Sequence, residues 1–456
     1  AEPPPPPPEP PPPAPASHPP RGLHVSFTDD PERTRTLSWF TDGSQAPASV
    51  LEYGPVEPGM SEADIQSAPL PSRVEATAAA VFEVEALCHS ATARGLPAGT
   101  SIRYRVGSDE GGWSAVKVLP ATPPASFRFC HYGDQGVTEA AQAVVAGVSQ
   151  RNPDFLLIAG DLSYANGDQP VWDRYFDMLE PLASRLPLMT TPGNHEAKDG
   201  GGAGYDSRLR QPGRNTYYGF DYKNIHFFCS TAGCLLQDLA SAGALAAEIL
   251  AMEADLAAAA QRRANGEIDF IVVAQHYTIW TNEDGRDPAN LSLVALEEHI
   301  LLRYGVDLLL VAHDHIYERS KPMAYGRAVD DGYVQVTQGG GGKSMYELLA
   351  NPADWSAFNT LRYGFTEYAV DGPLIRGTSY AVDRADNSLP ADGALEIIDQ
   401  FELSARSAAA RSRFALPVRA KSEVLGRDWN AVTRHTYIRN SLHDALETGA
   451  VAGSRM

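Results

Sequence analysis

The sequence predicts an α/β protein with a mixed sheet system, preceded by a small antiparallel β-sandwich. From Ser126 onward, apolar strands alternate with helical segments, a pattern typical of α/β domains. Several later strands favour antiparallel pairing, which makes the sheet system mixed. Residues 22–122 show short runs of alternating polar and apolar residues between Gly, Pro and Asp, a spacing typical of a fibronectin III-like β-sandwich.

The chain divides into four predicted segments. A proline-rich arm at 1–21 carries thirteen prolines in its first twenty residues, which favours polyproline II or plain disorder. The sandwich at 22–122 should contain strands at 25–27, 36–40, 49–53, 80–84 and 101–106. An α/β domain follows at 125–404. A C-terminal extension at 405–456 has one helical stretch near 437–446 and no chemical interpretation.

Within the α/β domain, the order of strands and helices can be predicted in more detail. Strands are expected at 127–132, 154–159, 188–191, 225–229, 270–274 and 307–311, with helices at 139–150, 169–182, 242–264 and 293–304. Asn265 and Gly266 should end the third helix at its C-terminus. Strands at 333–336, 364–370 and 395–403 are interpreted as antiparallel.

Length, charge and hydropathy exclude some classes of protein. The 456 residues suffice for about two or three domains with a full core. A net charge of −20 without a basic stripe argues against nucleic acid and anionic membranes as partners. No apolar run reaches the roughly 18 residues of a membrane span. The chain starts at Ala1 without a signal-peptide core, which predicts a mature form or an expression product.

The cysteines bear on the compartment of the protein. Cys229 and Cys234 flank a short loop that a disulfide could close, whereas four buried thiols, including Cys88 and Cys130, are the alternative. Asn290 begins a glycosylation sequon, which together with the proline-rich arm favours an oxidising, extracellular location. We therefore expect secretion to the cell surface or wall, where the arm would attach to the matrix, with a vacuole or lysosome as the other option.

Metal-type ligands follow five of the predicted core strands. The run 154–164 is the centre of this pattern, because its buried strand ends at Gly160 and delivers Asp161 and Tyr164 to the end where such sheets bind ligands. The occurrence of such donors at five strand ends that are far apart in sequence is hard to explain without a shared ion site. The collected donors are Asp134, Asp161, Tyr164, Asn194, His276, His313 and His315. The histidines without such company, interpreted as structural, are His24, His89, His131, His226 and His299.

Seven donors are too many for one tetrahedral ion and suit two ions that share a bridge. Asp161, with two oxygens and a central strand, is the expected bridge. Asp134, Tyr164 and one histidine complete an anion-rich set, and holding the phenol as phenolate calls for a strongly acidic ion such as Fe(III). Asn194 and two histidines complete a nearly neutral set, suited to one divalent ion, namely Zn, Mn or Fe.

These motifs resemble those of the purple acid phosphatases, within the calcineurin-like metallophosphoesterases. The family pattern of DxG, GDxxY, GNH plus an acidic residue, VxxH and GHxH reads here as residues 134–136, 160–164, 193–196, 273–276 and 312–315. The resemblance covers about residues 22–404 and implies an αββα sandwich of two stacked mixed sheets behind the N-terminal β-sandwich. It also implies Fe(III) bound by His315, the divalent ion bound by His313, and a secreted acid phosphatase acting on small phosphomonoesters.

The chain departs from the family pattern at two places. Ala312 replaces the usual Gly of the last motif, and Gly285 and Arg286 stand where large family members usually carry substrate-facing histidines. We predict that phosphate recognition passes to Arg286 or to His195 alone. The implied mechanism is attack on phosphorus by hydroxide formed on the ions. His195 is the candidate to protonate or stabilise the leaving oxygen, and support of the metal ligands through Glu196 is its alternative role.

Two other functions stay open. The missing histidines keep a phosphodiesterase or pyrophosphatase on the same metal pair as an alternative. The proline-rich arm motivates a structural cell-surface protein with a vestigial phosphatase domain, against which seven intact ligands argue. The oligomeric state is left open. Residues 338–344 resemble a nucleotide-binding P-loop, but Thr337 stands where that motif requires Gly, so we interpret them as a flexible turn near the crevice.

Overall fold

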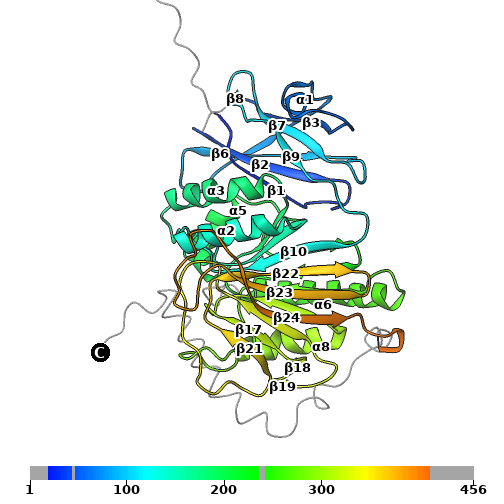
Figure 1. Cartoon of the computed structure of the whole chain (residues 1–456), viewed down its shortest axis with the longest axis vertical. Coiled ribbons are helices and arrows are strands. Elements are labelled where there is room, and N and C mark those ends of the chain that lie inside the picture. The colour runs from blue at the N-terminus through cyan, green and yellow to red at the C-terminus, as the bar shows by residue number, and fades with distance from the viewer. Residues whose placement is uncertain (1–18, 44–46, 236–241, 411–456) are drawn as a thin grey trace, which may run out of the picture.

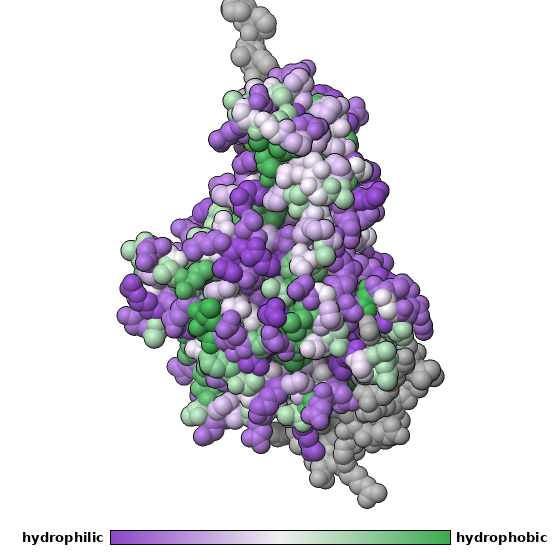
Figure 2. All heavy atoms as spheres, turned by 45° about the vertical axis from the view of Figure 1, so that its right-hand side comes forward, coloured by the Kyte–Doolittle hydropathy of each residue, from purple (hydrophilic) through white to green (hydrophobic). Residues whose placement is uncertain are grey.

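The computed structural model describes residues 19–43, 47–235 and 242–410. Most of the predicted proline-rich arm lies outside these residues, as does most of the C-terminal extension with its expected helical stretch near 437–446. Within the described ranges, no helix is both long enough and apolar enough to cross a bilayer. Figure 2 shows a face on which hydrophilic residues dominate and apolar residues form small separate groups, as the net charge of −20 leads one to expect.

Runs of alternating residues form the N-terminal β-sandwich, shown in blue and cyan in Figure 1. Its strands are β1 (Arg21–Ser26), β2 (Arg35–Asp42), β3 (Val50–Pro55), β4 (Ser72–Glu75), β5 (Thr77–Ala80), β6 (Ala86–Ala93), β7 (Ile102–Ser108), β8 (Gly112–Trp113) and β9 (Lys117–Leu119), with helix α1 (Glu62–Ser67) after β3. One sheet has the order β1-β2-β6-β5 and the other β4-β3-β7-β8, with β9 beside β7. Val25, Trp39, Leu51 and Val106 are buried between them.

The strand predicted at 80–84 is wrong. β5 ends at Ala80 and β6 begins at Ala86, and Glu83 between them has a φ of 54°. A positive φ belongs to turns and not to extended chain. The apolar side chain that suggested a strand, Val81, packs instead into the core that joins the sandwich to the α/β domain.

Buried apolar strands build two stacked sheets in the α/β domain. Their strands are β10 (Phe127–Tyr132), β11 (Phe155–Ala159), β12 (Leu188–Thr191), β13 (Tyr218–Tyr222), β14 (Ile225–Cys229), β15 (Phe270–Ala274), β16 (Leu308–Val311), β17 (Tyr317–Ser320), β20 (Val334–Gln338), β21 (Ser356–Thr360), β22 (Gly364–Asp371), β23 (Leu374–Ala381) and β24 (Glu396–Ser404). A small hairpin of β18 (Met323–Ala324) and β19 (Arg327–Ala328) lies apart from them.

The two sheets are both mixed. The first has the order β12-β11-β10-β22-β23-β24 and the second β13-β14-β15-β16-β20-β17-β21. Pairing is parallel from β10 to β12 and along β14, β15, β16 and β20. The strand predicted at 333–336 was interpreted as antiparallel, which is wrong for one of its sides, because β20 pairs parallel with β16 and antiparallel with β17. Phe129, Phe155, Phe227 and Leu310 fill the space between the sheets.

Helices cover the outer faces of both sheets, so the predicted αββα sandwich is confirmed (Figure 1). They are α2 (Glu139–Arg151) and α3 (Pro170–Ala183) on the first sheet, α6 (Ala242–Ala264), α7 (Leu291–Leu293), the π-helical turn η3 (Val294–Glu298) and α8 (His299–Tyr304) on the second, and the short α4 (Asn194–Ala197), η1 (Gly200–Gly202) and α5 (Ala203–Asp206) after β12. The β-sandwich rests on α3, where Arg21 donates to Asp173 over 2.7 Å and Phe40 packs on Phe176.

Of the two interpretations of the cysteines, the structure has the four buried thiols and not the possible Cys229–Cys234 disulfide. Cys229 lies in the core between the sheets, and the Cys234 thiol donates to the Pro192 carbonyl over 3.0 Å. Burial raises the pKa of Cys229 to about 12, which disfavours the reactive thiolate. The cysteines therefore give no support for an oxidising compartment.

Candidate metal centre

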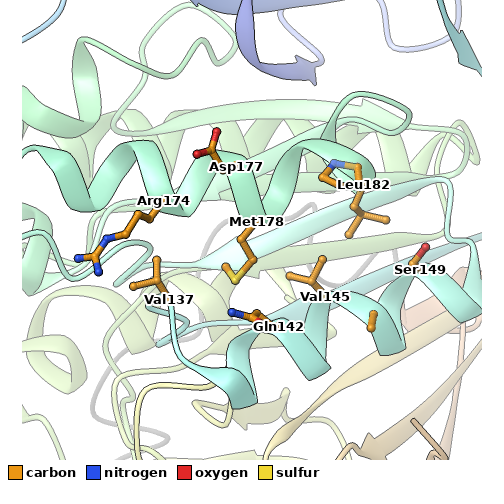
Figure 3. Close-up of a pocket in the computed structure, with 10 residues that line it drawn as sticks. Val137, Gln142, Val145, Ser149, Arg174, Asp177, Met178 and Leu182 are labelled. Carbon is orange, nitrogen blue, oxygen red and sulfur yellow. The ribbon is translucent and has the colours of Figure 1, made fainter. Parts of the chain in front are cut away.

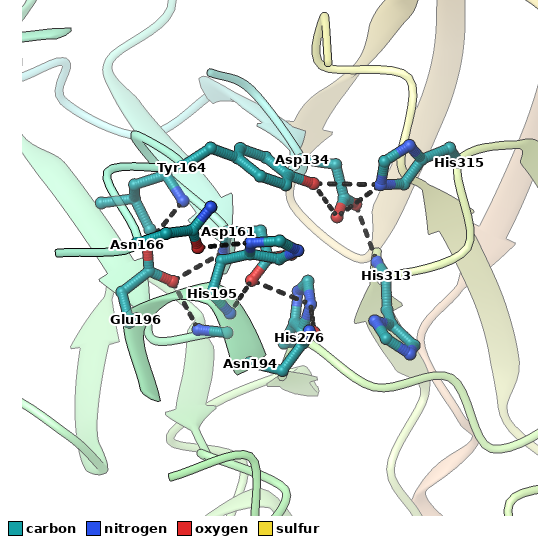
Figure 4. A network of polar contacts seen from close by, with 12 residues as sticks. Asp134, Asp161, Tyr164, Asn166, Asn194, His195, Glu196, His276, His313 and His315 are labelled. Carbon is teal, nitrogen blue, oxygen red and sulfur yellow. Dashed lines mark hydrogen bonds and ion pairs between the residues drawn. The ribbon is translucent and has the colours of Figure 1, made fainter. Parts of the chain in front are cut away.

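The carboxyl ends of the parallel strands of both sheets meet at one edge of the α/β domain. Five loops start there, one each after β10, β11, β12, β15 and β16, and they bring all seven predicted donors together (Figure 4). Four donors have positive φ angles, namely Asp134 (57°), Asp161 (51°), Tyr164 (57°) and His313 (67°). Residues other than glycine rarely adopt this conformation, and where they do they often sit at functional sites.

One half of the centre consists of Asp134, Tyr164 and His315. The Tyr164 hydroxyl donates to Asp134 Oδ1 over 3.0 Å and lies 3.0 Å from His315 Nε2. His315 Nε2 is in turn 3.3 Å from Asp134 Oδ1. Three potential ligand atoms therefore point at one position, in the combination that the sequence analysis assigned to the anion-rich set.

The other half consists of Asp161, Asn194, His276 and His313. His276 Nε2 lies 3.0 Å from Asn194 Oδ1 and 3.3 Å from Asp161 Oδ1. The rings of His276 and His313 are 5.0 Å apart between centroids. The two halves adjoin, because Asp134, Asp161 and His276 each place a ligand atom within 4.8 Å of the others.

Hydrogen bonds from outside the donor set orient the ligands. His276 Nδ1 lies 2.8 Å from the Ala159 carbonyl, which can only accept, so Nδ1 donates and Nε2 faces the site, where it would bind a cation once its proton is lost. The backbone N–H of His195 donates to Asp161 Oδ1 over 2.8 Å, and that of His313 donates to Asp134 Oδ2 over 2.7 Å. These contacts leave carboxylate, phenol, amide and imidazole groups facing inward, a donor set that fits two ions of the expected kinds.

The ionisation of the donors is strongly perturbed by their surroundings. Burial and the neighbouring Asp134 raise the pKa of Tyr164 well above its ordinary value, so the phenolate needs a strongly acidic partner. Burial alone would raise the pKa of Asp161, but the neighbouring His276 brings it below its ordinary value. Burial and Arg286 lower the pKa of His313 far below its ordinary value, which keeps that ring neutral and able to bind a cation.

Glu196 joins two of the loops that carry the predicted donors. Its buried carboxylate accepts the backbone N–H groups of Gly193, Asp161 and Leu162 at 2.7–2.9 Å. A single side chain thus holds the loop after β11 against the loop after β12. The motif showed that an acidic residue follows His195, but its three backbone partners could not be read from the sequence.

The two predicted substrate contacts, His195 and Arg286, lie in different settings. The His195 ring packs on Tyr164 with centroids 4.2 Å apart, and its Nδ1 donates to Asn166 Oδ1 over 2.6 Å. Arg286 is mostly buried, with its Nε 2.6 Å from Asp314 Oδ1. Both roles remain predictions, and Asn166 is a partner of His195 that the sequence did not reveal.

The glycine-rich run at 338–344 is part of the surroundings of the centre. The prediction of a flexible turn is wrong, because a Cβ on Gly339 would lie 2.0 Å from the Asp314 carbonyl oxygen and one on Gly341 2.1 Å from that of Gly133. The run is therefore packed tightly against two ligand loops. At the end of the run, the Ser344 hydroxyl lies 2.7 Å from His315 Nδ1, and two residues further on Tyr346 stacks on the His315 ring with centroids 4.1 Å apart.

A separate cavity of about 620 Å³ lies between α2 and α3 (Figure 3). Val145, Met178 and Leu182 give it apolar walls, and Arg174 and Asp177 are charged residues that also line it. None of the seven donors lines it, so it does not belong to the metal centre.

The comparisons with known proteins agree with the fold. The family profile "Calcineurin-like phosphoesterase" matches residues 127–317, and "Purple acid Phosphatase, N-terminal domain" matches residues 20–119. The chain is 26% identical to purple acid phosphatase 18 of Arabidopsis thaliana over 77% of this chain and 78% of the relative, and 28% identical to acid phosphatase type 7 of Mus musculus over 77% and 85%.

A solved structure shares this fold. The purple acid phosphatase isolated from yellow lupin (Lupinus luteus) seeds superimposes with a TM-score of 0.70 at 19% identity, covering 89% of this chain and 78% of that one. The two sheets, the N-terminal sandwich and the two family profiles thus define a metallophosphoesterase with an N-terminal β-sandwich. The chain belongs to the purple acid phosphatase family.

Proposed function

We propose that this protein hydrolyses small phosphomonoesters at acid pH with a centre of Fe(III) and one divalent ion, Zn, Mn or Fe. The observation that carries the proposal is the convergence of seven donors from five loops into two adjoining sets. When bound, the two ions would supply Lewis acidity toward phosphoryl oxygens and lower the pKa of water. Tyr164 on the anion-rich side supports iron, because its buried phenol ionises only beside a strongly acidic cation.

The side chains of this protein have three further proposed roles: bridging the ions, donating a proton and binding phosphate. Asp161 lies between the two sets and is the proposed bridge. His195 has Nδ1 occupied by Asn166, so Nε2 is the atom that would deliver a proton to the leaving oxygen. Arg286 is the proposed second contact to phosphate. The segment boundaries 22–122 and 125–404, and a location in the cell wall, at the cell surface or in a vacuole, belong to the same proposal.

Metal analysis combined with a substrate profile tests the proposal. We expect about two ions per chain, one of them iron, and faster turnover of an aryl phosphomonoester than of the matching diester or of pyrophosphate at pH 5. Preference for the diester or for pyrophosphate would select the alternative activity that the missing histidines keep open. If the protein binds two ions but hydrolyses neither the phosphomonoester, the diester nor pyrophosphate, the alternative of a structural protein with a vestigial phosphatase domain would be favoured.

The role of His195 needs a test of its own. His195→Ala should keep both ions and lower kcat by roughly 10²–10⁴, with the largest loss for poor leaving groups. Asn166→Ala removes only the partner of Nδ1 and should lower kcat less. Loss of an ion from His195→Ala would show instead that this residue supports the metal ligands.

A further inference from the structure

Lys343 stands at the metal centre on a backbone that is fixed on both sides. Its backbone N–H donates to the Asp134 carbonyl over 3.0 Å. The preceding Gly342 has a φ of 139°, and a Cβ there would lie 2.4 Å from the Ala141 nitrogen. The following Ser344 is bonded to His315. The position of Lys343 beside the anion-rich half is therefore set by the ligand loops themselves.

The side chain of Lys343 reaches over one ligand of the centre. Its Nζ lies 4.8 Å from the centroid of the Tyr164 ring, the same ring on which His195 packs. The residue is exposed, and no carboxylate of the described residues forms an ion pair with it. An exposed ammonium without an ion pair among the described residues thus lies over the same Tyr164 ring as the proposed general acid.

Arg286, another cation near the candidate centre, is in the opposite situation. Its guanidinium is mostly buried and is paired with Asp314 over 2.6 Å. That carboxylate offsets the charge of Arg286 before any substrate arrives. Of the two, Lys343 is therefore the one whose charge is uncompensated, which matters because a phosphate approaches a chain of net charge −20.

We propose that Lys343 binds the phosphoryl group of the substrate through its ammonium and takes the place of the substrate-facing histidines that this chain lacks. A lysine acts on phosphate as a point charge with three donors, so it can meet the anion without a fixed geometry. The proposal rests on the proposed function for the identity of the substrate, but the contact itself is to phosphate. Contact with Tyr164 alone is the competing role.

Binding of inorganic phosphate to the metal-replete protein tests the proposal by isothermal titration calorimetry. K343M keeps the length and the apolar stem of the side chain and should raise the Kd for phosphate about tenfold or more, the usual range for a charge-assisted contact. K343R keeps the charge and should stay within about threefold of wild type. K321M is the matched control, because Lys321 donates to the Asp354 carbonyl away from the centre.

Metal content and steady-state kinetics complete the test. K343M should keep both ions and raise KM for a phosphomonoester by the same factor as Kd, with a smaller change in kcat. An unchanged Kd in K343M, loss of an ion, or a wild-type protein that binds no phosphate would each overturn the proposal. If wild type binds phosphate but hydrolyses no phosphomonoester, the proposed function fails, while the ratio of Kd values still decides the role of Lys343.

Discussion

His276 and His226 have nearly the same electrostatic surroundings, but the structure uses them differently. His226 lies on β14, and His276 follows the neighbouring strand β15. Burial alone would lower the pKa of both rings, yet adjacent carboxylates raise it to about 9 in each case, Asp161 for His276 and Asp221 with Asp255 for His226. A perturbed pKa therefore does not separate a predicted ligand from a histidine interpreted as structural in this protein.

What separates them is the use of the second ring nitrogen. His226 has carboxylates on both nitrogens, Asp221 at 2.8 Å and Asp255 on α6 at 2.5 Å, so it fixes that helix on the sheet. His276 spends Nδ1 on the Ala159 carbonyl and directs Nε2 at other potential ligands. The two histidines therefore differ in whether a ring nitrogen faces other predicted donors, and each prediction below tests whether such convergence marks a metal centre.

The largest effect is expected for Asp161→Ala. It removes the proposed bridge and the anion that screens the repulsion between the two ions, so both ions should be lost together with nearly all activity. Asp221→Ala is the matched control. It removes a carboxylate that lies 2.8 Å from His226, as Asp161 lies 3.3 Å from His276, and it should leave the metal content unchanged. Elemental analysis of both variants decides the point, and two ions retained in Asp161→Ala would remove the bridging role.

Tyr164→Phe should abolish a visible absorption band with little effect on folding. The phenolate of Tyr164 bound to Fe(III) would give a charge-transfer band, and the ring itself remains in the variant. Tyr104→Phe is the control, since the Tyr104 hydroxyl donates to the Ser184 carbonyl over 2.6 Å and belongs to the β-sandwich. Spectra of iron-replete protein under oxidising conditions provide the measurement. A band that survives Tyr164→Phe would assign the colour to another ligand.

The sequence predicted which donors come together better than it predicted the side chains that orient them. Five strand ends carried recognisable donors, because ligand chemistry restricts the residue types that can stand there. The partners Ser344, Tyr346 and Asn166 come from loops, whose paths depend on packing that no local pattern records. The interpretation of the glycine-rich run failed for the same reason. The sequence does not show that the Gly133 carbonyl packs against Gly341 and leaves no room for a side chain there.

The strands of the fold also differ in how well the sequence predicts them. Long apolar strands such as β10, β14 and β15 were predicted with the bounds observed, because strands buried on both faces read as continuous apolar runs. The strands β13, β17, β21 and β23 were not predicted. β21 has no buried residue, and β23 alternates buried with partly exposed positions, so tertiary pairing decides their conformation.

Ser344→Ala should produce a moderate effect confined to the anion-rich half. It removes the hydroxyl that orients His315 through Nδ1, a kind of change that typically costs 10–100-fold in metal affinity. Thr41→Val is the control, because Thr41 bonds to His89 over 2.8 Å in the sandwich, far from any donor. Competition with a chelator measures the affinity of each ion. Equal weakening of both ions would mean that Ser344 supports the whole loop and not the single ring.

The smallest effect is expected for His226→Gln, and it should appear in stability alone. The pKa of His226 is about 9 in the folded protein against 6.5 for a free histidine, so its stabilisation is fully present below about pH 6.5 and is lost as the pH rises through 9. Asp221 and Asp255 are 40% and 30% exposed, which screens the contacts and leaves about 1–2 kcal/mol. Denaturant titrations between pH 5.5 and 10 should therefore show wild type more stable than His226→Gln at low pH, with the difference closing near pH 10.

A stability difference that stays constant with pH would mean that packing, and not the charge of His226, holds α6 on the sheet. Unchanged metal content in the variant would keep this histidine outside the centre.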